Sequence, residues 1–224
     1  MPTTLIVKLK NHHETEHLQL GKVTLRGQID VPEGATGIVL FAHGSGSSRL
    51  SPRNQLVARI LRSAGLGTLL FDLLSEEEEQ QDMRTRHLRF DIKLLAERLL
   101  EAAAWLETNP HTQNLKAGMF GSSTGGAAAL EAAAQKPERI QAVVSRGGRP
   151  DLAGPSLLKV KCPTLLIVGE RDEAVLTLNR EAFGRMTCTK ELVTIPGATH
   201  LFEEPGALEK VAVCAADWFK THLV

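Results

Sequence analysis

The chain has 224 residues, of which 42% are hydrophobic and 23% charged, a composition typical of globular proteins that excludes disorder and collagen. Its 26 Lys and Arg balance 26 Asp and Glu, so the net charge gives no reason to expect nucleic acid or anionic lipid as a partner. No apolar run approaches the roughly 20 residues that span a bilayer, and no signal core is present at the start, so we expect a cytoplasmic protein.

The first predicted element is an antiparallel hairpin. Hydrophobic residues alternate with polar ones in the segment that contains Val23, Leu25, Ile29 and Val31, a period typical of a strand with one buried face. Residues 5–9 are the expected partner strand, and the hairpin is expected to lie at an edge of the sheet.

From Gly37 onward, short apolar runs alternate with longer segments of helical period. The runs are 38–42, 68–71, 116–120, 141–145 and 164–168, and a further strand is expected at 191–195. Such alternation predicts an α/β fold with a mostly parallel sheet that is covered on both faces. No repeat, flexible linker or shift in composition divides the chain, so we expect one domain over residues 1–224.

Two of the intervening segments carry clear helical stripes. Apolar residues recur at steps of three and four from Ile92 to Leu106, and Asn109-Pro110 ends this helix; a similar stripe runs from Leu208 to His222. The acidic run from Glu76 to Asp82 is interpreted as a solvated loop that leads into the first of these helices, with a loop bordering a substrate cleft as the alternative.

Residues 121–125, Gly-Ser-Ser-Thr-Gly, match the G-x-S-x-G pattern of the nucleophile elbow. In that motif the serine lies on a strained turn between a strand and a helix, and its flanking positions must be small because the two backbones approach each other closely. An apolar strand precedes the motif and an alanine-rich helix follows it. This context favours Ser123 as a nucleophile.

A nucleophilic serine requires a histidine base and an acid, which in this fold class follow it in the order acid, then histidine. Of the eight histidines, only His200 and His222 follow Ser123, and His222 belongs to the apolar stripe of the last helix. His200 lies in a turn after a predicted strand, where α/β sheets place their ligand groups. Asp172 is the preferred acid because it also follows a strand; the alternatives are Asp151, then Glu170 or Glu173.

An oxyanion that forms during attack on a carbonyl requires two preorganised donors. The backbone N–H of Thr124, next to the nucleophile, is one candidate, and the N–H of Ser45 in the loop after strand 38–42 is the other. His43, at the start of that loop, is interpreted as a packing residue. The loop matches neither glycine-rich phosphate-binding fingerprint, and the three cysteines are widely spaced, so we expect no cofactor, zinc ion or disulfide.

Four landmarks occur in order: HGSG at 43–46, GSSTG at 121–125, GERD at 169–172 and GATH at 197–200. On the basis of these landmarks, the chain resembles α/β-hydrolases of the dienelactone-hydrolase-like group. The resemblance covers nearly the whole chain from Val23 onward. The resemblance implies a three-layer α/β-hydrolase sandwich with eight strands and a triad of Ser123, Asp172 and His200. Dienelactone hydrolase itself has a cysteine nucleophile, so Ser123 favours a serine esterase instead.

Only the 18 residues from Arg146 to Pro163 separate two predicted strands at the position where many relatives carry a helical cap, so we expect none here. The predicted function is hydrolysis of small carboxylic esters through an acyl-enzyme, with a small-molecule ester as the expected substrate and neither nucleic acid nor membrane as a partner. A thioesterase or acyltransferase with the same residues, and a catalytically silent hydrolase fold that serves in binding, are the alternatives.

Overall fold

The computed structural model describes residues 12–223, which form a sheet of eight strands in the order β1-β2-β4-β3-β5-β6-β7-β8. The strands are β1 (His12–Leu20), β2 (Val23–Val31), β3 (Gly37–Ala42), β4 (Gly67–Phe71), β5 (Lys116–Ser122), β6 (Ile140–Arg146), β7 (Thr164–Gly169) and β8 (Lys190–Ile195). The helices are α1 (Pro52–Ser63), α2 (Glu76–Thr85), α3 (Ile92–Thr108), α4 (Thr124–Gln135), α5 (Glu173–Arg185) and α6 (Ala207–His222), with short 3-10 segments η1 (Leu88–Phe90) and η2 (Pro150–Lys159).

Strands β3 to β8 are parallel to one another, whereas β2 is antiparallel to both β1 and β4. The predicted α/β class, with a mostly parallel sheet and an N-terminal antiparallel hairpin, is therefore confirmed. The strand that pairs with β2 is His12–Leu20, and the predicted partner at 5–9 lies outside the described residues.

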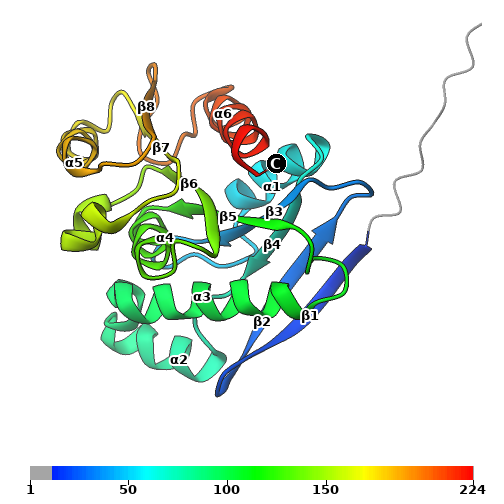
Figure 1. The fold of residues 1–224 in the computed structure, drawn as a ribbon. Helices are drawn as coiled ribbons and strands as arrows, with labels where there is room; N and C mark the ends of the chain where they lie inside the picture. Colours follow the sequence, from blue (N-terminus) through cyan, green and yellow to red (C-terminus); the bar gives the residue numbers. More distant parts are fainter. Residues whose placement is uncertain (1–11, 224) are drawn as a thin grey trace, which may run out of the picture.

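The sheet is the middle of three layers (Figure 1). Helices α3 and α4 cover one face, where leucines and alanines of both helices pack on alternate residues of β3 and β5. Helices α1 and α6 cover the other face, with Phe219 and Val57 among the buried residues there. Strands β3, β4 and β7 are buried along their whole length, which explains their continuous apolar runs in the sequence.

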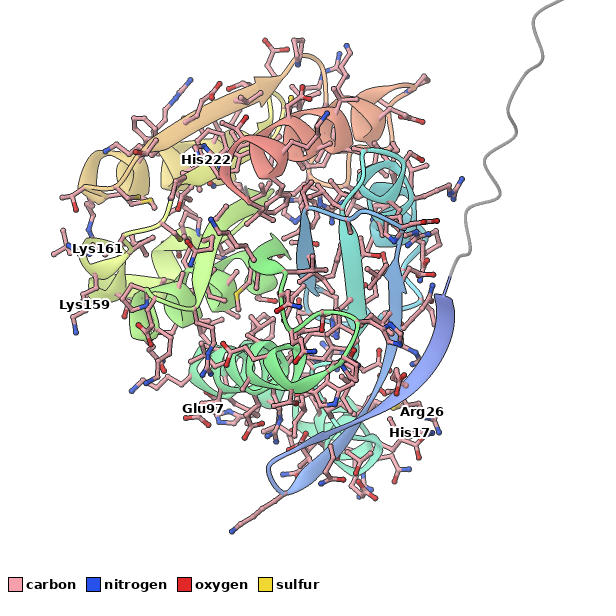
Figure 2. All side chains as sticks on the ribbon, turned by 45° about the vertical axis from the view of Figure 1, so that its right-hand side comes forward. His17, Arg26, Glu97, Lys159, Lys161 and His222 are labelled. Atoms are coloured by element: carbon pink, nitrogen blue, oxygen red, sulfur yellow. The ribbon has the colours of Figure 1, made fainter. Side chains whose placement is uncertain are left out.

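The hairpin extends past the rest of the sheet and packs its inner face on α3 (Figure 1). Leu18 and Leu25 are opposite each other in the register and completely buried, whereas His17 and its partner Arg26 lie on the outer face (Figure 2). Arg26 forms an ion pair with Glu76 at the start of α2, so the hairpin is also joined to that helix.

The acidic run at 76–82 is helical, so the expectation of a loop there was wrong. Ser75 forms a capping box with Glu78: the Ser75 hydroxyl accepts from the Glu78 N–H, and the Glu78 carboxylate accepts from the Ser75 N–H. The four glutamates of the first turn are favourably placed at the positive end of the helix dipole. The cap and the dipole together stabilise a segment that has no apolar stripe.

Between β6 and β7, within the described part of the chain, residues 147–163 hold only η2 and short connections, so no cap domain is inserted there. The loops that follow the parallel strands therefore meet at an uncovered edge of the sheet, where the carboxyl ends of β3, β5, β6, β7 and β8 lie side by side. Within residues 12–223 no helix has the length and apolar character needed to cross a membrane.

Candidate active site

Ser123 lies between the last residue of β5 and the first residue of α4, with backbone angles φ 52° and ψ −120°. This conformation is sparsely populated by residues with a Cβ, and it costs on the order of 1–3 kcal/mol unless the surroundings enforce it. Two backbone hydrogen bonds do so: the Ser123 N–H donates to Arg146 O at 3.2 Å, and Ser123 O accepts from the Arg149 N–H at 3.1 Å. The turn presents the serine at the carboxyl edge of the sheet.

The two glycines of the motif allow the strand and helix to approach each other. A Cβ on Gly121 would lie 2.4 Å from Gly125 O, and a Cβ on Gly125 would lie 2.1 Å from Ala42 O. Both contacts are with backbone atoms that cannot move aside independently. Only glycine fits at positions 121 and 125, because any side chain would overlap the neighbouring backbone.

The imidazole of His200 contacts the carboxylate of Asp172. The Nδ1 to Oδ2 distance is 2.6 Å, in the range of a charge-assisted hydrogen bond. Because an ionised carboxylate only accepts, Nδ1 carries the proton, which leaves Nε2 of a neutral ring with a free lone pair. The Asp172 side chain is 14% exposed and that of His200 39%, so the imidazole remains partly accessible while the carboxylate behind it is largely covered.

The loops that carry these two residues are tied to each other. The Arg171 N–H donates to Ala198 O at 2.9 Å, and Glu170 accepts the Gly197 N–H at 2.7 Å through its carboxylate. Glu170 therefore supports the loop of His200 rather than its imidazole. Asp151, another acid considered from the sequence, forms a two-bond ion pair with Arg149, and Glu173 begins α5. Among the candidate acids, the structure places Asp172 against His200.

Ser123 and His200 line one cavity of about 220 Å³ at the carboxyl edge of the sheet. Its other walls are Gly44, Ser45 and Ser47 from the loop after β3, Ser51, Arg53 and Asn54 at the start of α1, and Ser122, Arg146 and Leu201. The structure thus brings the three predicted residues of the triad to one place. Their catalytic roles stay predictions.

The two predicted oxyanion donors are neighbours: Ser45 lines the cavity of Ser123, and both Ser45 and Thr124 line a second cavity beside it. The N–H of Thr124 is the first of α4 and so has no acceptor within the helix. The Ser45 N–H instead donates to the Thr124 hydroxyl at 3.0 Å, so it must exchange this partner to bind a substrate oxygen. Sequence reasoning identified both residues without detecting this contact.

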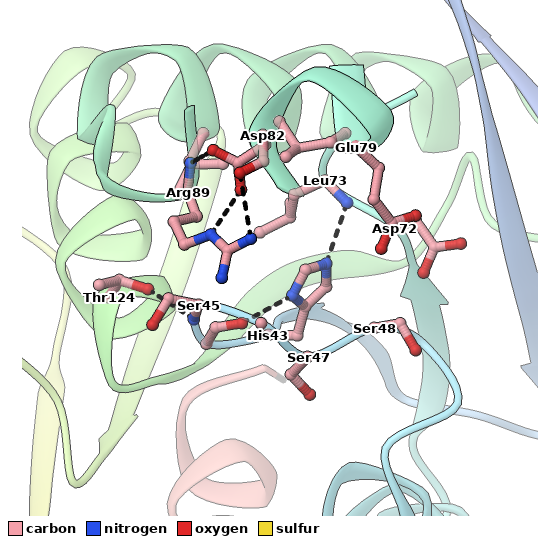
Figure 3. A pocket seen from close by; sticks show the side chains of 14 residues that line it. His43, Ser45, Ser47, Ser48, Asp72, Leu73, Glu79, Asp82, Arg89 and Thr124 are labelled. Carbon is pink, nitrogen blue, oxygen red and sulfur yellow. Dashed lines mark hydrogen bonds and ion pairs between the residues drawn. The ribbon is translucent and has the colours of Figure 1, made fainter. Parts of the chain in front are cut away.

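A second cavity adjoins the first, since Gly44, Ser45 and Ser47 line both (Figure 3). Its far wall is formed by α2 and η1, from which Arg89 reaches in while paired with Asp82. The alternative interpretation of the acidic run was a loop that borders a substrate cleft. Glu79 and Asp82 of this run do line a cavity, but they belong to a helix.

His43 is held in the wall of the second cavity as a neutral ring (Figure 3). Its Nδ1 donates to Gly44 O at 3.0 Å, and its Nε2 accepts the Leu73 N–H at 3.1 Å. Burial lowers the pKa of His43, because the charged form would be poorly solvated and could not accept from Leu73. The prediction of a packing role for His43 agrees with these contacts.

Sequence reasoning missed Arg146 and Arg53, which line the cavity of Ser123. The available signal was the position of Arg146 at the end of an apolar strand, where a charged residue reaches the carboxyl edge of the sheet. Within residues 12–223 no group of three or more potential ligands could hold a metal ion.

Comparison with known proteins places this site in context. Residues 25–223 match the model of the dienelactone hydrolase family. A dienelactone hydrolase from Anabaena variabilis is 59% identical in sequence, and its crystal structure superposes with a TM-score of 0.94 over 96% of this chain and 99% of that chain. Est1E from Butyrivibrio proteoclasticus has the same fold at 17% identity, with a TM-score of 0.77 over 92% of this chain and 98% of its own.

A curated relative from Mycobacterium tuberculosis is 57% identical over 203 residues, which are 91% of this chain but 45% of the relative. It is named "Putative phosphoribosyl transferase". The chain therefore spans about half the length of this relative, and the name describes a protein with a large part that has no counterpart in the match.

Proposed function

Because the chain belongs to the dienelactone hydrolase family, we propose that it is a serine hydrolase that cleaves small carboxylic esters through an acyl-enzyme. The observation that carries this proposal is the 2.6 Å contact between Asp172 and His200 beside a serine held at φ 52°. A strained serine, a histidine with a free Nε2 and a carboxylate behind it are the parts that acyl transfer requires.

In the first half of the reaction, His200 Nε2 takes the proton from Ser123 Oγ while that oxygen bonds to the ester carbonyl carbon. The carbonyl oxygen becomes an oxyanion, which accepts hydrogen bonds from the N–H groups of Thr124 and Ser45. Asp172 stabilises the imidazolium ion. When the tetrahedral intermediate collapses, His200 returns the proton to the alcohol oxygen, and the carbon–oxygen bond of the ester breaks.

In the second half, His200 removes a proton from water, whose oxygen attacks the acyl carbon on Ser123. The second tetrahedral intermediate collapses to the carboxylic acid, and the proton on His200 returns to Ser123 Oγ. The open edge of the sheet supports small or partly exposed substrates, because no inserted domain covers the cavity within the described chain.

The direct test is hydrolysis of p-nitrophenyl acetate by wild type and by Ser123→Ala. We expect turnover to fall by about a millionfold, to the detection limit, because the groups of such a site act as a unit. Ser122→Ala is a matched control, since the neighbouring hydroxyl donates to Asn54 at 3.2 Å and takes no part in the proposed chemistry. Equal rates for Ser123→Ala and wild type would refute the assignment.

Two alternatives within the same fold have distinct signatures. A catalytically silent binding protein would not be labelled by a fluorophosphonate, whereas the proposed hydrolase should be labelled at Ser123. A thioesterase or acyltransferase would be labelled as well, so parallel assays with an ester, a thioester and an amide of the same acyl group separate these activities.

The name of the mycobacterial relative suggests transfer of a phosphoribosyl group, but we do not extend that activity to this chain. The match covers 45% of the relative, and the matched residues are those that belong to the hydrolase family. Consumption of phosphoribosyl diphosphate by this chain alone would contradict our assignment.

A further inference from the structure

Arg146 is a buried cation in the wall of the proposed active site. It is the last residue of β6, and it is only 7% exposed although it lines the cavity that contains Ser123 and His200. Its Nε and Nη1 atoms are buried without a hydrogen-bond partner in the described structure. The guanidinium carbon lies 5.8 Å from the centre of the Phe202 ring, a cation–π contact with the loop of His200.

A second arginine faces the same cavity. Arg53, in the first turn of α1, also has a buried Nε without a partner. Its Nη1 lies 3.6 Å from Glu203, whose side chain is 66% exposed, so this pair is largely solvated. Burial and, to a smaller extent, the charge of Arg53 lower the pKa of Arg146 to about 10, which leaves Arg146 charged at neutral pH.

No carboxylate balances these charges from within the cavity. Its described lining contains two arginines, His200 and neutral residues, but neither aspartate nor glutamate. An unpaired buried charge is strongly unfavourable, and buried guanidinium groups in proteins are ordinarily paired with anions. The fold therefore places Arg146 beside the nucleophile without a carboxylate partner, and Arg53 is paired only with the solvated Glu203.

We propose that Arg146 and Arg53 bind a phosphate group of the substrate, so that the esters cleaved at Ser123 carry a phosphate close to the scissile bond. Two guanidinium groups match the charge of a phosphate dianion, whose several oxygens can accept from both at once. Ser51 and Asn54 supply further polar groups on the same wall. This inference rests on the proposed hydrolase function for its substrate, although phosphate binding itself does not require catalysis.

Binding is tested first, by calorimetric titration of Ser123→Ala with inorganic phosphate and, separately, with acetate at equal ionic strength. We expect phosphate to bind more tightly than acetate, and Arg146→Met to weaken phosphate binding at least tenfold. Arg59→Met, on the exposed side of α1, is the matched control and should change neither affinity. Absence of phosphate binding, preference for acetate, or equal loss in both variants would overturn the phosphate site.

Catalysis is tested with 1-acetylglycerol 3-phosphate and 1-acetylglycerol. We expect wild type to have the higher kcat/KM for the phosphorylated ester, and Arg146→Met to lower the ratio of the two values at least tenfold, with Arg146→Lys intermediate. A purely structural role of Arg146 would lower both values together and leave the ratio unchanged, which would overturn the proposal.

The two hypotheses fail in different ways. If Ser123→Ala binds phosphate but wild type hydrolyses neither ester, the phosphate site stands and the hydrolase function is wrong. If wild type hydrolyses the neutral ester equally well or better, the phosphate proposal is wrong and the hydrolase function stands. Arg53→Met provides a second variant in case Arg146→Met does not fold, and the same loss of phosphate preference is expected of it.

Discussion

The backbone N–H of Ser45 donates a hydrogen bond to the hydroxyl of Thr124 at 3.0 Å, which joins the loop after β3 to the first residue of α4. These two residues are also the proposed oxyanion donors. In the free protein, one of the two donors is thus occupied by a side chain of the other residue. A substrate oxygen must displace the hydroxyl before Ser45 can contribute.

Thr124→Val tests this competition, because valine retains the shape of threonine without the acceptor. A net hydrogen bond is worth about 0.5–1.5 kcal/mol, so we expect kcat/KM for an ester to rise by about 2- to 10-fold, with a similar loss of stability. Steady-state kinetics and urea unfolding measure the two effects, and Thr124→Ser serves as the control that retains the hydroxyl. A tenfold fall in kcat/KM would mean that the hydroxyl itself assists the reaction.

Asp172→Asn is expected to lower kcat for ester hydrolysis by about 10⁴-fold, because the amide can donate to Nδ1 and thereby stabilise the wrong tautomer of His200. Asp151→Asn, in η2 after β6, is the matched control. Since Asp151 is paired with Arg149, its loss should change kcat less than threefold, as measured with p-nitrophenyl acetate. Similar effects of the two variants would contradict the assignment of the acid.

His43 predicts a pH dependence of stability. Its pKa is lowered in the folded state, so the unfolded state binds more protons as the pH falls below the ordinary value of 6.5. The contribution of neutral His43 is thus complete above pH 6.5 and is lost as acid is added. Thermal unfolding between pH 7.5 and 5.5 should show a steeper loss of Tm in wild type than in His43→Gln; parallel curves would show that another group is responsible.

Gly125→Ala and Gly184→Ala are expected to have opposite effects on stability. A Cβ at Gly125 would lie 2.1 Å from Ala42 O, so the first variant should lose about 3 kcal/mol or more in its free energy of unfolding. No atom lies within 4 Å of a Cβ at Gly184 in α5, where alanine should gain about 0.5–1 kcal/mol. Urea titrations compare them, and equal tolerance of both changes would refute the close approach at the elbow.

The elements that follow local rules could be predicted from the sequence. Strands β3 to β7 follow from short apolar runs in the sequence, and α3 and α6 from apolar residues that recur at helical spacing. Helix α2 was missed because it has no apolar stripe. Its stability comes from the capping box at Ser75 and Glu78 and from the helix dipole, signals that periodicity does not contain.

For the site, the sequence alone determined the candidates, because the elbow at Ser123 and the turns of Asp172 and His200 follow strands in an order typical of this chemistry. Tertiary structure decided which acid meets His200, since Asp172, Asp151 and Glu170 all follow strands and only distance separates them. It also placed Arg146 and Arg53, 93 positions apart in the chain, in one cavity without a carboxylate. Burial and pairing depend on packing between distant segments, which no local pattern records.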